Sequence, residues 1–286
     1  MKHLCVFFLL LSVLAACVDS EDTGTSGEGG GQQTTLLGFT ALEISEELDS
    51  DAQTVTATHT YCYDTADRLT SCLTRQTTEG AGAIVLENAT TVTYGDATAT
   101  VTDAAGNTLT YNFDAGGRAA TCVYRTQWDE VRRYTFGYYE TPSGKHYLSR
   151  VTETLGDVSE PYSEISLDYT VSDVVTVTCV VDGDGQSFVL SFPSEGGVDN
   201  SAQLPCLFLA ELYPLSLHEA ALYARWLGDA SDVLMARCEP ADNAGSGEYT
   251  TYTYVVDAEG LPQQCRVLTE SYGYVYRRTL NYAFSR

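Results

Sequence analysis

The stretch Tyr61-Cys62-Tyr63-Asp64-Thr65-Ala66-Asp67-Arg68 decides the fold of this chain. Its tyrosines alternate with other residues, which is typical of a strand that has one buried face. Asp64 then opens a turn, and Asp67 lies where a type I turn is closed by a residue with positive φ. Because the alternation resumes after the turn, the stretch predicts a β-hairpin.

Two further segments share this layout. Tyr111-Asn112-Phe113-Asp114-Ala115-Gly116-Gly117-Arg118 repeats the order of aromatic residues, Asp and turn. The third begins at Tyr252, and its turn runs from Asp257 to Gly260. It has two extra residues between its last aromatic residue and its Asp, which preserves the side-chain phase. We therefore expect three equivalent hairpins, with positive φ at Gly117, at Gly260 and at the matching Asp67.

The cysteines follow the same repeat, since one lies eight residues after each turn Asp: Cys72, Cys122 and Cys265. Equivalent places in neighbouring hairpins lie about 10 Å apart, and a disulfide needs Cα atoms within about 7 Å. We expect these three to be packing residues that are not bridged to one another. Seven cysteines remain after Cys5 and Cys17 are set aside, and an odd number cannot all pair within one chain. No spacing suits a zinc site, so we expect no metal.

Further turn signals divide short strands at regular spacing, at residues 103–107, 142–144 and 182–185. This density predicts a mainly β fold in which antiparallel hairpins form a curved or barrel-like sheet. Whether the sheet closes is left open. One short helix is expected near 216–227, with Ser216 and Glu219 as a capping box and Gly228 at its end. It should pack its apolar side on the sheet.

The N-terminus predicts a bacterial lipoprotein. A short basic start and an apolar run lead to Leu14-Ala15-Ala16-Cys17. The run is too short to span a membrane, which takes about 20 residues, so residues 1–16 are expected to be a removed signal peptide. Cys17 is expected to carry acyl chains such as palmitate, and more than one chain holds a protein stably at a membrane. Residues 17–35 form a flexible acidic and Gly-rich tether, and 36–286 a single β-rich domain.

Charge limits the classes of partner. Without Lys2 the chain has 14 basic and 39 acidic residues, a net charge of 14 − 39 = −25. This excludes a general binder of nucleic acid or anionic membranes. Asp19, Glu21 and Asp22 resemble the export signal of some surface-exposed Bacteroidetes lipoproteins, although a merely solvated linker has the same composition. The expected location is the outer membrane, with a periplasmic or an outward orientation.

The sequence shows no catalytic constellation. It has no GxSxG motif, and after the signal its histidines are the widely separated His59, His146 and His218. We predict no catalytic residue and no cofactor. The aromatic residues remain as candidates, either as the core of the sheet or as a surface on which glycan rings stack. Trp128, at an expected hairpin tip, and the alternating Tyr272, Tyr274 and Tyr276 are the candidate stacking residues.

A family resemblance adds to this. The hairpins with a tyrosine, an aromatic residue and an Asp resemble YD-type repeats. Trp226-Leu227-Gly228, followed by Ser231 and Leu234, resembles an uncharacterised Bacteroidetes lipoprotein family with a porin-like β fold. The resemblance covers roughly residues 36–286. It implies a fold and an envelope location, and carries over no catalytic residue.

These observations predict a monomeric, lipid-anchored binding or structural module of the cell envelope. Its partners would be the membrane, through the lipid, and a glycan or another envelope protein. The alternative is an extracytoplasmic hydrolase with carboxylate chemistry, for which no single pair of acidic residues stands out because such residues are so numerous. A transmembrane barrel is a poorer option, because the aromatic strands are backed by Thr, Gly and Arg, and the chain ends Phe284-Ser285-Arg286.

Overall fold

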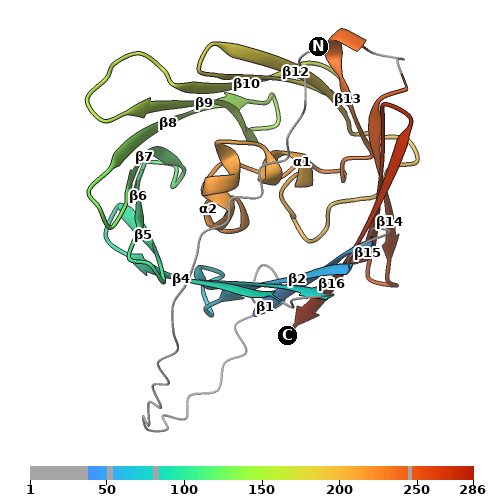
Figure 1. Ribbon diagram of the computed structural model, residues 1–286, viewed down its shortest axis with the longest axis horizontal. Helices are drawn as coiled ribbons and strands as arrows, with labels where there is room; N and C mark the ends of the chain where they lie inside the picture. The colour runs from blue at the N-terminus through green and yellow to red at the C-terminus, as the bar shows by residue number, and fades with distance from the viewer. Residues whose placement is uncertain (1–37, 50–53, 80–83, 244–246) are drawn as a thin grey trace, which may run out of the picture.

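The computed structural model describes residues 38–49, 54–79, 84–243 and 247–286. The expected signal peptide, Cys17 and the whole tether therefore lie outside the described residues. Sixteen strands form one antiparallel sheet, in which β1 pairs with β16 and closes the barrel. Figure 1 shows the strands as a ring around the helices. The prediction of a mainly β, barrel-like fold is confirmed, and the sheet closes.

The strands follow one another around the barrel in chain order. Their bounds are β1 (Ala41–Asp49), β2 (Thr54–Tyr63), β3 (Leu69–Glu79), β4 (Ile84–Tyr94), β5 (Thr98–Asp103), β6 (Thr108–Phe113), β7 (Ala119–Arg125), β8 (Val131–Glu140), β9 (His146–Leu155), β10 (Ser163–Val171), β11 (Val174–Val181), β12 (Asp184–Ser191), β13 (Arg237–Pro240), β14 (Tyr249–Val256), β15 (Pro262–Ser271) and β16 (Tyr274–Ser285).

The three predicted turns are confirmed. The φ angles of Asp67, Gly117 and Gly260 are 59°, 78° and 83°. In each turn the opening Asp accepts two backbone N–H groups through Oδ1, from the residues two and four positions later, at 2.8–3.0 Å. The β-ladder shifts register at the same place in all three hairpins. One aspartate therefore supplies the hydrogen bonds that hold each tight connection.

The predicted offset in the third copy is wrong. Tyr254 lies opposite Cys265, as Tyr61 lies opposite Cys72 and Tyr111 opposite Cys122. Tyr254 precedes its turn Asp by three residues, as the other two tyrosines do. The repeat is thus uniform without extra residues. Each cysteine shares the inward face with its tyrosine, and all seven cysteines after Cys17 are free thiols.

The helix prediction needs correction. The connection between β12 and β13, residues 192–236 (the insert), contains two short helices, α1 (Leu207–Glu211) and α2 (Glu219–Tyr223), and the 3₁₀ turn η1 (Leu215–His218). A second 3₁₀ turn, η2 (Ala241–Asn243), follows β13. No side-chain cap forms at the start of α2. Ser216 lies inside η1, and the N-cap position of α2 is taken by His218. The Glu219 carboxylate accepts a hydrogen bond from Tyr61 of the barrel wall, at 2.5 Å, instead of returning to its own helix.

The insert fills the lumen instead of covering an outer face of the sheet (Figure 1). The Trp226 ring lies against Tyr94, Tyr111 and Phe113, with centroids 5.1–5.8 Å apart. Tyr223 stacks on Tyr61 at 3.8 Å. Bulky aromatic rings dominate the energy of a core, so the tyrosines of the hairpin repeat serve mainly to pack the insert. Among the described residues, no helix has both the length and the apolar character needed to cross a membrane.

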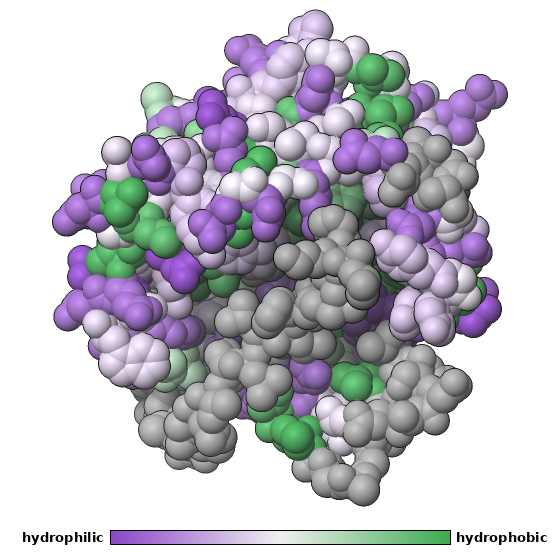
Figure 2. All heavy atoms as spheres, turned by 45° about the horizontal axis from the view of Figure 1, so that its top comes forward, coloured by the Kyte–Doolittle hydropathy of each residue, from purple (hydrophilic) through white to green (hydrophobic). Residues whose placement is uncertain are grey.

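The wall is apolar inside and polar outside. On β10, Ile165 and Leu167 are buried against the lumen. The alternate residues point outward, where Glu164 pairs with Arg150 of β9 at 2.6 Å. On the face drawn in Figure 2, hydrophilic residues cover most of the described surface, and hydrophobic ones form small separate groups.

The two ends of the barrel differ. At the insert end, the insert touches three hairpins: Trp226 O accepts the N–H of Ala119, Asp229 accepts that of His146, and Ser201 donates to Gly260 O. Both described chain ends lie here too, since Phe39 packs on Tyr63 and Phe284. The other end, the mouth, carries the β3–β4, β7–β8 and β15–β16 connections.

Candidate ligand site

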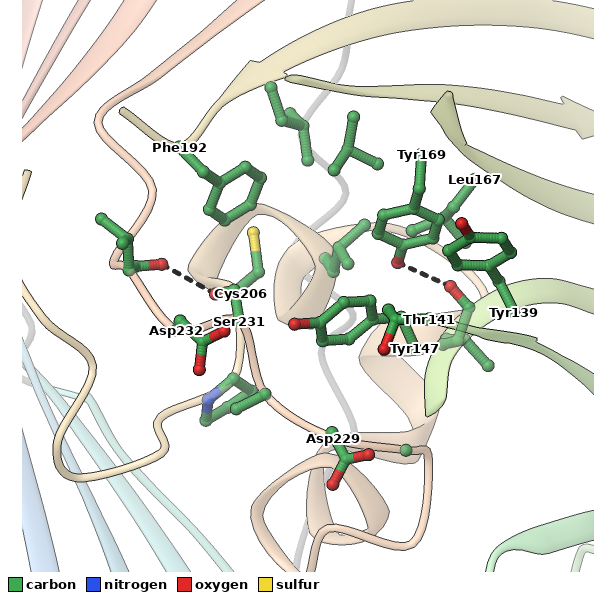
Figure 3. A pocket seen from close by; sticks show the side chains of 18 of the residues that line it. Tyr139, Thr141, Tyr147, Leu167, Tyr169, Phe192, Cys206, Asp229, Ser231 and Asp232 are labelled. Atoms are coloured by element: carbon green, nitrogen blue, oxygen red, sulfur yellow. Dashed lines mark hydrogen bonds between the residues drawn. The ribbon is translucent and has the colours of Figure 1, made fainter. Parts of the chain in front are cut away.

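A cavity of about 430 Å³ lies at the insert end, between the ends of β8–β12 and the insert. Figure 3 shows its lining. Most of the lining side chains are apolar, among them Leu148, Leu167, Leu190, Phe192 and Leu209. A mostly apolar cavity with a few polar groups is the usual form of a small-molecule site. We refer to it as the insert-end cavity.

Three tyrosines form one wall of this cavity. Tyr139 and Tyr147 face each other across the β8–β9 pair. Both stack on Tyr169 of β10, with ring centroids 5.7 and 5.4 Å away and interplanar angles of 8° and 24°. We call Tyr139, Tyr147 and Tyr169 the tyrosine wall.

The tyrosine wall lies where the hydrogen-bonded pairing of β9 with β10 ends. The β9–β10 ladder runs only from the Glu153–Ser163 pair to the Arg150–Ser166 pair. Beyond it, Tyr169 Oη donates to Leu148 O at 2.7 Å and crosses the gap between the two strands. A smaller cavity of about 230 Å³ lies on this gap and shares Tyr139 and Tyr169 with the first. Two of the three rings of the tyrosine wall, Tyr139 and Tyr169, therefore border both cavities.

Three aspartates edge the insert-end cavity. Asp173 accepts a hydrogen bond from Ser194 Oγ at 2.8 Å. Its pKa is lowered, chiefly by this bond. Asp229 accepts the backbone N–H of His146 at 2.7 Å, and Asp232 pairs with Lys145. Each carboxylate retains acceptor capacity for a ligand hydroxyl or amine, because an ionised carboxylate offers about four lone-pair sites.

Gly228 permits the insert to form the base of this cavity. Its φ is +96°, and a Cβ there would lie 2.5 Å from His146 O and 3.2 Å from Leu148 N. Only glycine allows this approach to β9 without displacing backbone. The predicted Gly228 therefore matters as a contact point and not as a helix cap, since α2 already ends at Tyr223.

The four predicted stacking residues all lie at the mouth. Trp128 is 75% exposed, and Tyr272, Tyr274 and Tyr276 are 72%, 66% and 57% exposed. The structure brings the three tyrosines together on the β15–β16 hairpin. Trp128, between β7 and β8, is separated from them by about half of the barrel circumference. They do not form one surface with Trp128.

The tyrosine wall was missed in the sequence. Its only signal was the pairing of Tyr138-Tyr139 with Tyr147 across the predicted turn at 142–144. Tyr169 lies far along the chain, and the opening of the β9–β10 ladder that lets it stack has no local sequence signal.

A buried polar network fixes the insert to the barrel wall. Glu153 is fully buried and accepts hydrogen bonds from Arg132 (2.8 Å), Tyr134 (3.0 Å), Tyr213 (2.7 Å) and Ser163 (2.6 Å). Because Tyr213 belongs to the insert and the other groups to the wall, the network ties the two together. All the acceptor sites of Glu153 that the geometry allows are engaged, so this cluster is structural.

Of the predicted site residues, Cys17 lies outside the described residues. Across the described ranges, no group of three or more His, Cys, Asp or Glu is placed to hold a metal ion. With its tyrosine wall, its apolar lining and the aspartates at its edge, the insert-end cavity can position a ligand by ring stacking, apolar contact and carboxylate acceptors.

Comparison with known proteins agrees with this architecture. Residues 61–263 match the family described as "Domain of unknown function (DUF4595) with porin-like fold". A porin-like protein from Bacteroides uniformis ATCC 8492 is similar in structure, with a TM-score of 0.79 and 36% identity over 86% of this chain and 96% of that chain. A porin-like protein from Bacteroides vulgatus ATCC 8482 shares the fold, with a TM-score of 0.57 and 12% identity over 86% and 98% of the two chains.

No curated protein matches this chain. The porin-like part of the predicted resemblance is confirmed by the matched residues and by the structural similarity. The chain belongs to the family of domains of unknown function with a porin-like fold, DUF4595.

Proposed function

We propose that this protein is a lipid-anchored, monomeric binding module of the bacterial outer membrane, and that its ligand is a glycan held in the insert-end cavity. The tyrosine wall above an apolar cavity with carboxylates at its edge is the observation that carries the proposal. The apolar face of a sugar ring would stack on tyrosine, and its hydroxyls would donate to Asp173 or Asp229. The deeper leucines suit a sugar with an apolar substituent.

The polarity of the barrel supports attachment at a membrane through the lipid of Cys17. Strands that cross a bilayer as a barrel alternate apolar side chains outward with polar ones inward. Here the alternation is reversed, and aromatic rings of the wall and insert fill much of the lumen. A barrel filled in this way offers surfaces and cavities for binding. The acidic tether supports an outward orientation on the cell surface.

The proposal is tested by a glycan array with the fragment 36–286, which contains every strand of the closed barrel. A glycan that binds should then be titrated against Tyr147→Ala, which removes one ring of the tyrosine wall. We expect about 1–3 kcal/mol of lost affinity from the removal of a buried aromatic contact. The matched control is Tyr272→Ala, which removes an exposed tyrosine at the mouth and should leave the affinity unchanged.

The exposed hairpin tyrosines favour a second candidate, a glycan surface at the mouth. The same two variants separate the candidates, because loss with Tyr272→Ala alone would place the glycan at the mouth. An array without any bound glycan would contradict glycan binding at either place. The hydrolase alternative predicts shortened products after incubation, which mass spectrometry of the glycan would reveal.

A further inference from the structure

The lumen above the insert is open to solvent at the mouth. Tyr274 and Tyr276 have the inward-pointing parity of the buried Leu280 and Tyr282 on β16, yet both are more than half exposed. Asn88 on β4 and Gln186 on β12 are likewise on inward-facing positions and exposed. β16 extends here past its pairing with β1, which ends at the Leu48–Arg278 pair. Arg278 and Glu211, farther in, are 20% and 33% exposed, so a solvent-accessible space borders the inner face of β16 at this end. We call it the well.

The base of the well carries five ionisable side chains from five elements, which we call the floor cluster: Glu46 of β1, His59 of β2, Glu211 of α1, Glu219 of α2 and Arg278 of β16. Arg278 joins two carboxylates, since its guanidinium lies 2.5 Å from Glu211 Oε1 and 3.5 Å from Glu46 Oε1. One guanidinium charge is therefore shared by two carboxylates.

The third carboxylate of the floor cluster, Glu219, is contacted by a tyrosine and a histidine. It accepts a hydrogen bond from Tyr61 Oη at 2.5 Å, and His59 Nδ1 lies 3.4 Å from the same oxygen. Thr74 Oγ1 lies 3.2 Å from His59 Nδ1 and competes for it. No arginine or lysine pairs with Glu219 in the described part of the chain.

Charge in the floor cluster is thus unbalanced. Three carboxylates face one guanidinium, which gives −2 with His59 neutral and −1 with His59 protonated. The side chains are 20–37% exposed, so a ligand can reach them from the well. Burial raises the pKa of Glu211 against the opposing effect of Arg278. Partly buried carboxylates that lack a full countercharge are stabilised by a cation.

A buried hydroxyl beside the cluster supports a polar ligand independently of the acids. Tyr282 is only 4% exposed, and its Oη has no hydrogen-bond partner among the described residues. A buried hydroxyl without a partner costs free energy, and an incoming donor or acceptor would remove that cost. The pKa of Tyr282 is raised mainly by burial, and the charges of Arg278, Glu211 and Glu46 also act on it. Its phenol is therefore close to the floor cluster.

The inner face of β16 above the floor cluster also suits a cationic ligand. Tyr274, Tyr276 and Arg278 follow one another on the inner face of β16, so two exposed rings lead from the mouth to the floor. Aromatic faces attract ammonium groups within about 6 Å. The net charge of the whole chain, −24, draws cations toward the molecule as well.

We propose that the well is a second binding site, distinct from the insert-end cavity, and that it takes an organic cation with primary ammonium groups. One ammonium would lie among Glu46, Glu211 and Glu219, and the chain of the ligand would run up along Tyr276 and Tyr274. The site does not depend on glycan binding at the insert end.

The test is isothermal titration of the fragment 36–286 with spermidine at physiological salt, where diffuse attraction is screened over about 8 Å. We expect saturable binding of one spermidine per chain, weakened about tenfold by Glu211→Gln, a loss of about 1.4 kcal/mol. The matched control is Glu43→Gln, which removes an equal charge from the outer face of β1, the strand that carries Glu46, and should leave the dissociation constant unchanged.

Equal weakening by the two variants would show that spermidine senses only the overall charge and would overturn the site, as would the absence of saturable binding. Where Glu211→Gln fails to fold, Tyr276→Leu decides, because this exposed side chain bears little on folding. Weaker binding in Tyr276→Leu supports the site, and unchanged binding overturns it.

Discussion

Asp114 shows how one side chain specifies a turn. Its Oδ1 accepts the N–H groups of Gly116 and Arg118, and Arg118 Nε returns to Oδ2 at 3.0 Å. The backbone N–H of Arg118 is the main cause that lowers the pKa of Asp114. The arrangement leaves φ at +78° for Gly117, where an added Cβ would meet no other atom within 4 Å. Strain at this position is therefore a matter of backbone conformation alone.

Gly117→Val should destabilise the protein by about 1–3 kcal/mol, because a β-branched residue is strained at positive φ. Gly116→Val should cost clearly less. Gly116 lies outside the positive-φ region, and a Cβ there meets only the flexible end of Arg118, whose exposed ion pair is worth about 1 kcal/mol or less. Urea unfolding of both variants gives the comparison. Equal losses would contradict the turn geometry.

His218 should make stability depend on pH. It is fully buried among Tyr134, Phe136 and Tyr111, and burial lowers its pKa to about 3. An unfolded histidine titrates near 6.5, so below that pH the unfolded chain binds a proton that the folded chain does not. Stability from this group is lost as pH falls from about 6.5 toward 3, at up to about 1.4 kcal/mol per pH unit.

The measurement is the free energy of unfolding at pH 7, 5.5 and 4.5 for the wild type and His218→Phe. The variant should lose less stability than the wild type over this interval, even where it is less stable at pH 7. The many carboxylates of the chain contribute to both slopes and cancel in the difference. Identical slopes would mean that His218 takes up its proton at the same pH in the folded and the unfolded chain.

At the scale of elements, the insert is held by the Glu153 network. Arg132→Met should cost about 2–3 kcal/mol, because it leaves a fully buried carboxylate without its cation while three hydrogen bonds remain. The double variant Arg132→Met/Glu153→Gln should recover part of this loss, since it removes the charge as well. Denaturant unfolding of the pair tests this. A double variant less stable than Arg132→Met would argue that the glutamate is not charged in the folded protein.

Gly228 and Gly144 separate close packing from backbone strain. Both have positive φ, at +96° and +85°. A Cβ at Gly228 would meet His146 O at 2.5 Å, whereas one at Gly144 meets nothing within 4 Å. Gly144→Ala should therefore lose only about 1 kcal/mol, and Gly228→Ala clearly more. Thermal unfolding of both variants tests this, and equal losses would mean that the insert can move away from β9 freely.

The same elements show which parts of the structure can be predicted from the sequence. Hairpins were predictable because Asp, Gly and alternating aromatic residues act within a few residues of one another. The insert was not, since Ser216 and Glu219 form a good capping box by local rules, and only Tyr61, 158 positions away, redirects the carboxylate. The tyrosine wall depends likewise on the break in the β9–β10 ladder, which brings together residues of two strands that are far apart in the chain. Exposure of the β15–β16 tyrosines at the mouth followed from a hairpin longer than its β1 neighbour.

At the scale of the molecule, the ends of the barrel have different surroundings. The described chain begins at the insert end, where Phe39 packs on Tyr63 and Phe284. A tether that joins Cys17 to this point would hold the insert end toward the membrane and direct the mouth, with the well, away from it. The two proposed sites would then face opposite directions on the anchored protein.

The anchor itself is the last prediction. Cys17→Ser removes the thiol that would carry the acyl chains. The domain of residues 36–286 has a polar outer wall and a net charge of 14 − 35 = −21, neither of which favours a bilayer. The variant should therefore appear in the soluble fraction of lysed cells, whereas the wild type should partition with membranes. Ser20→Ala, a substitution in the tether next to the anchor, is the matched control and should partition as the wild type does. Membrane partitioning of Cys17→Ser would show that the barrel or a protein partner holds the chain at the membrane without lipid.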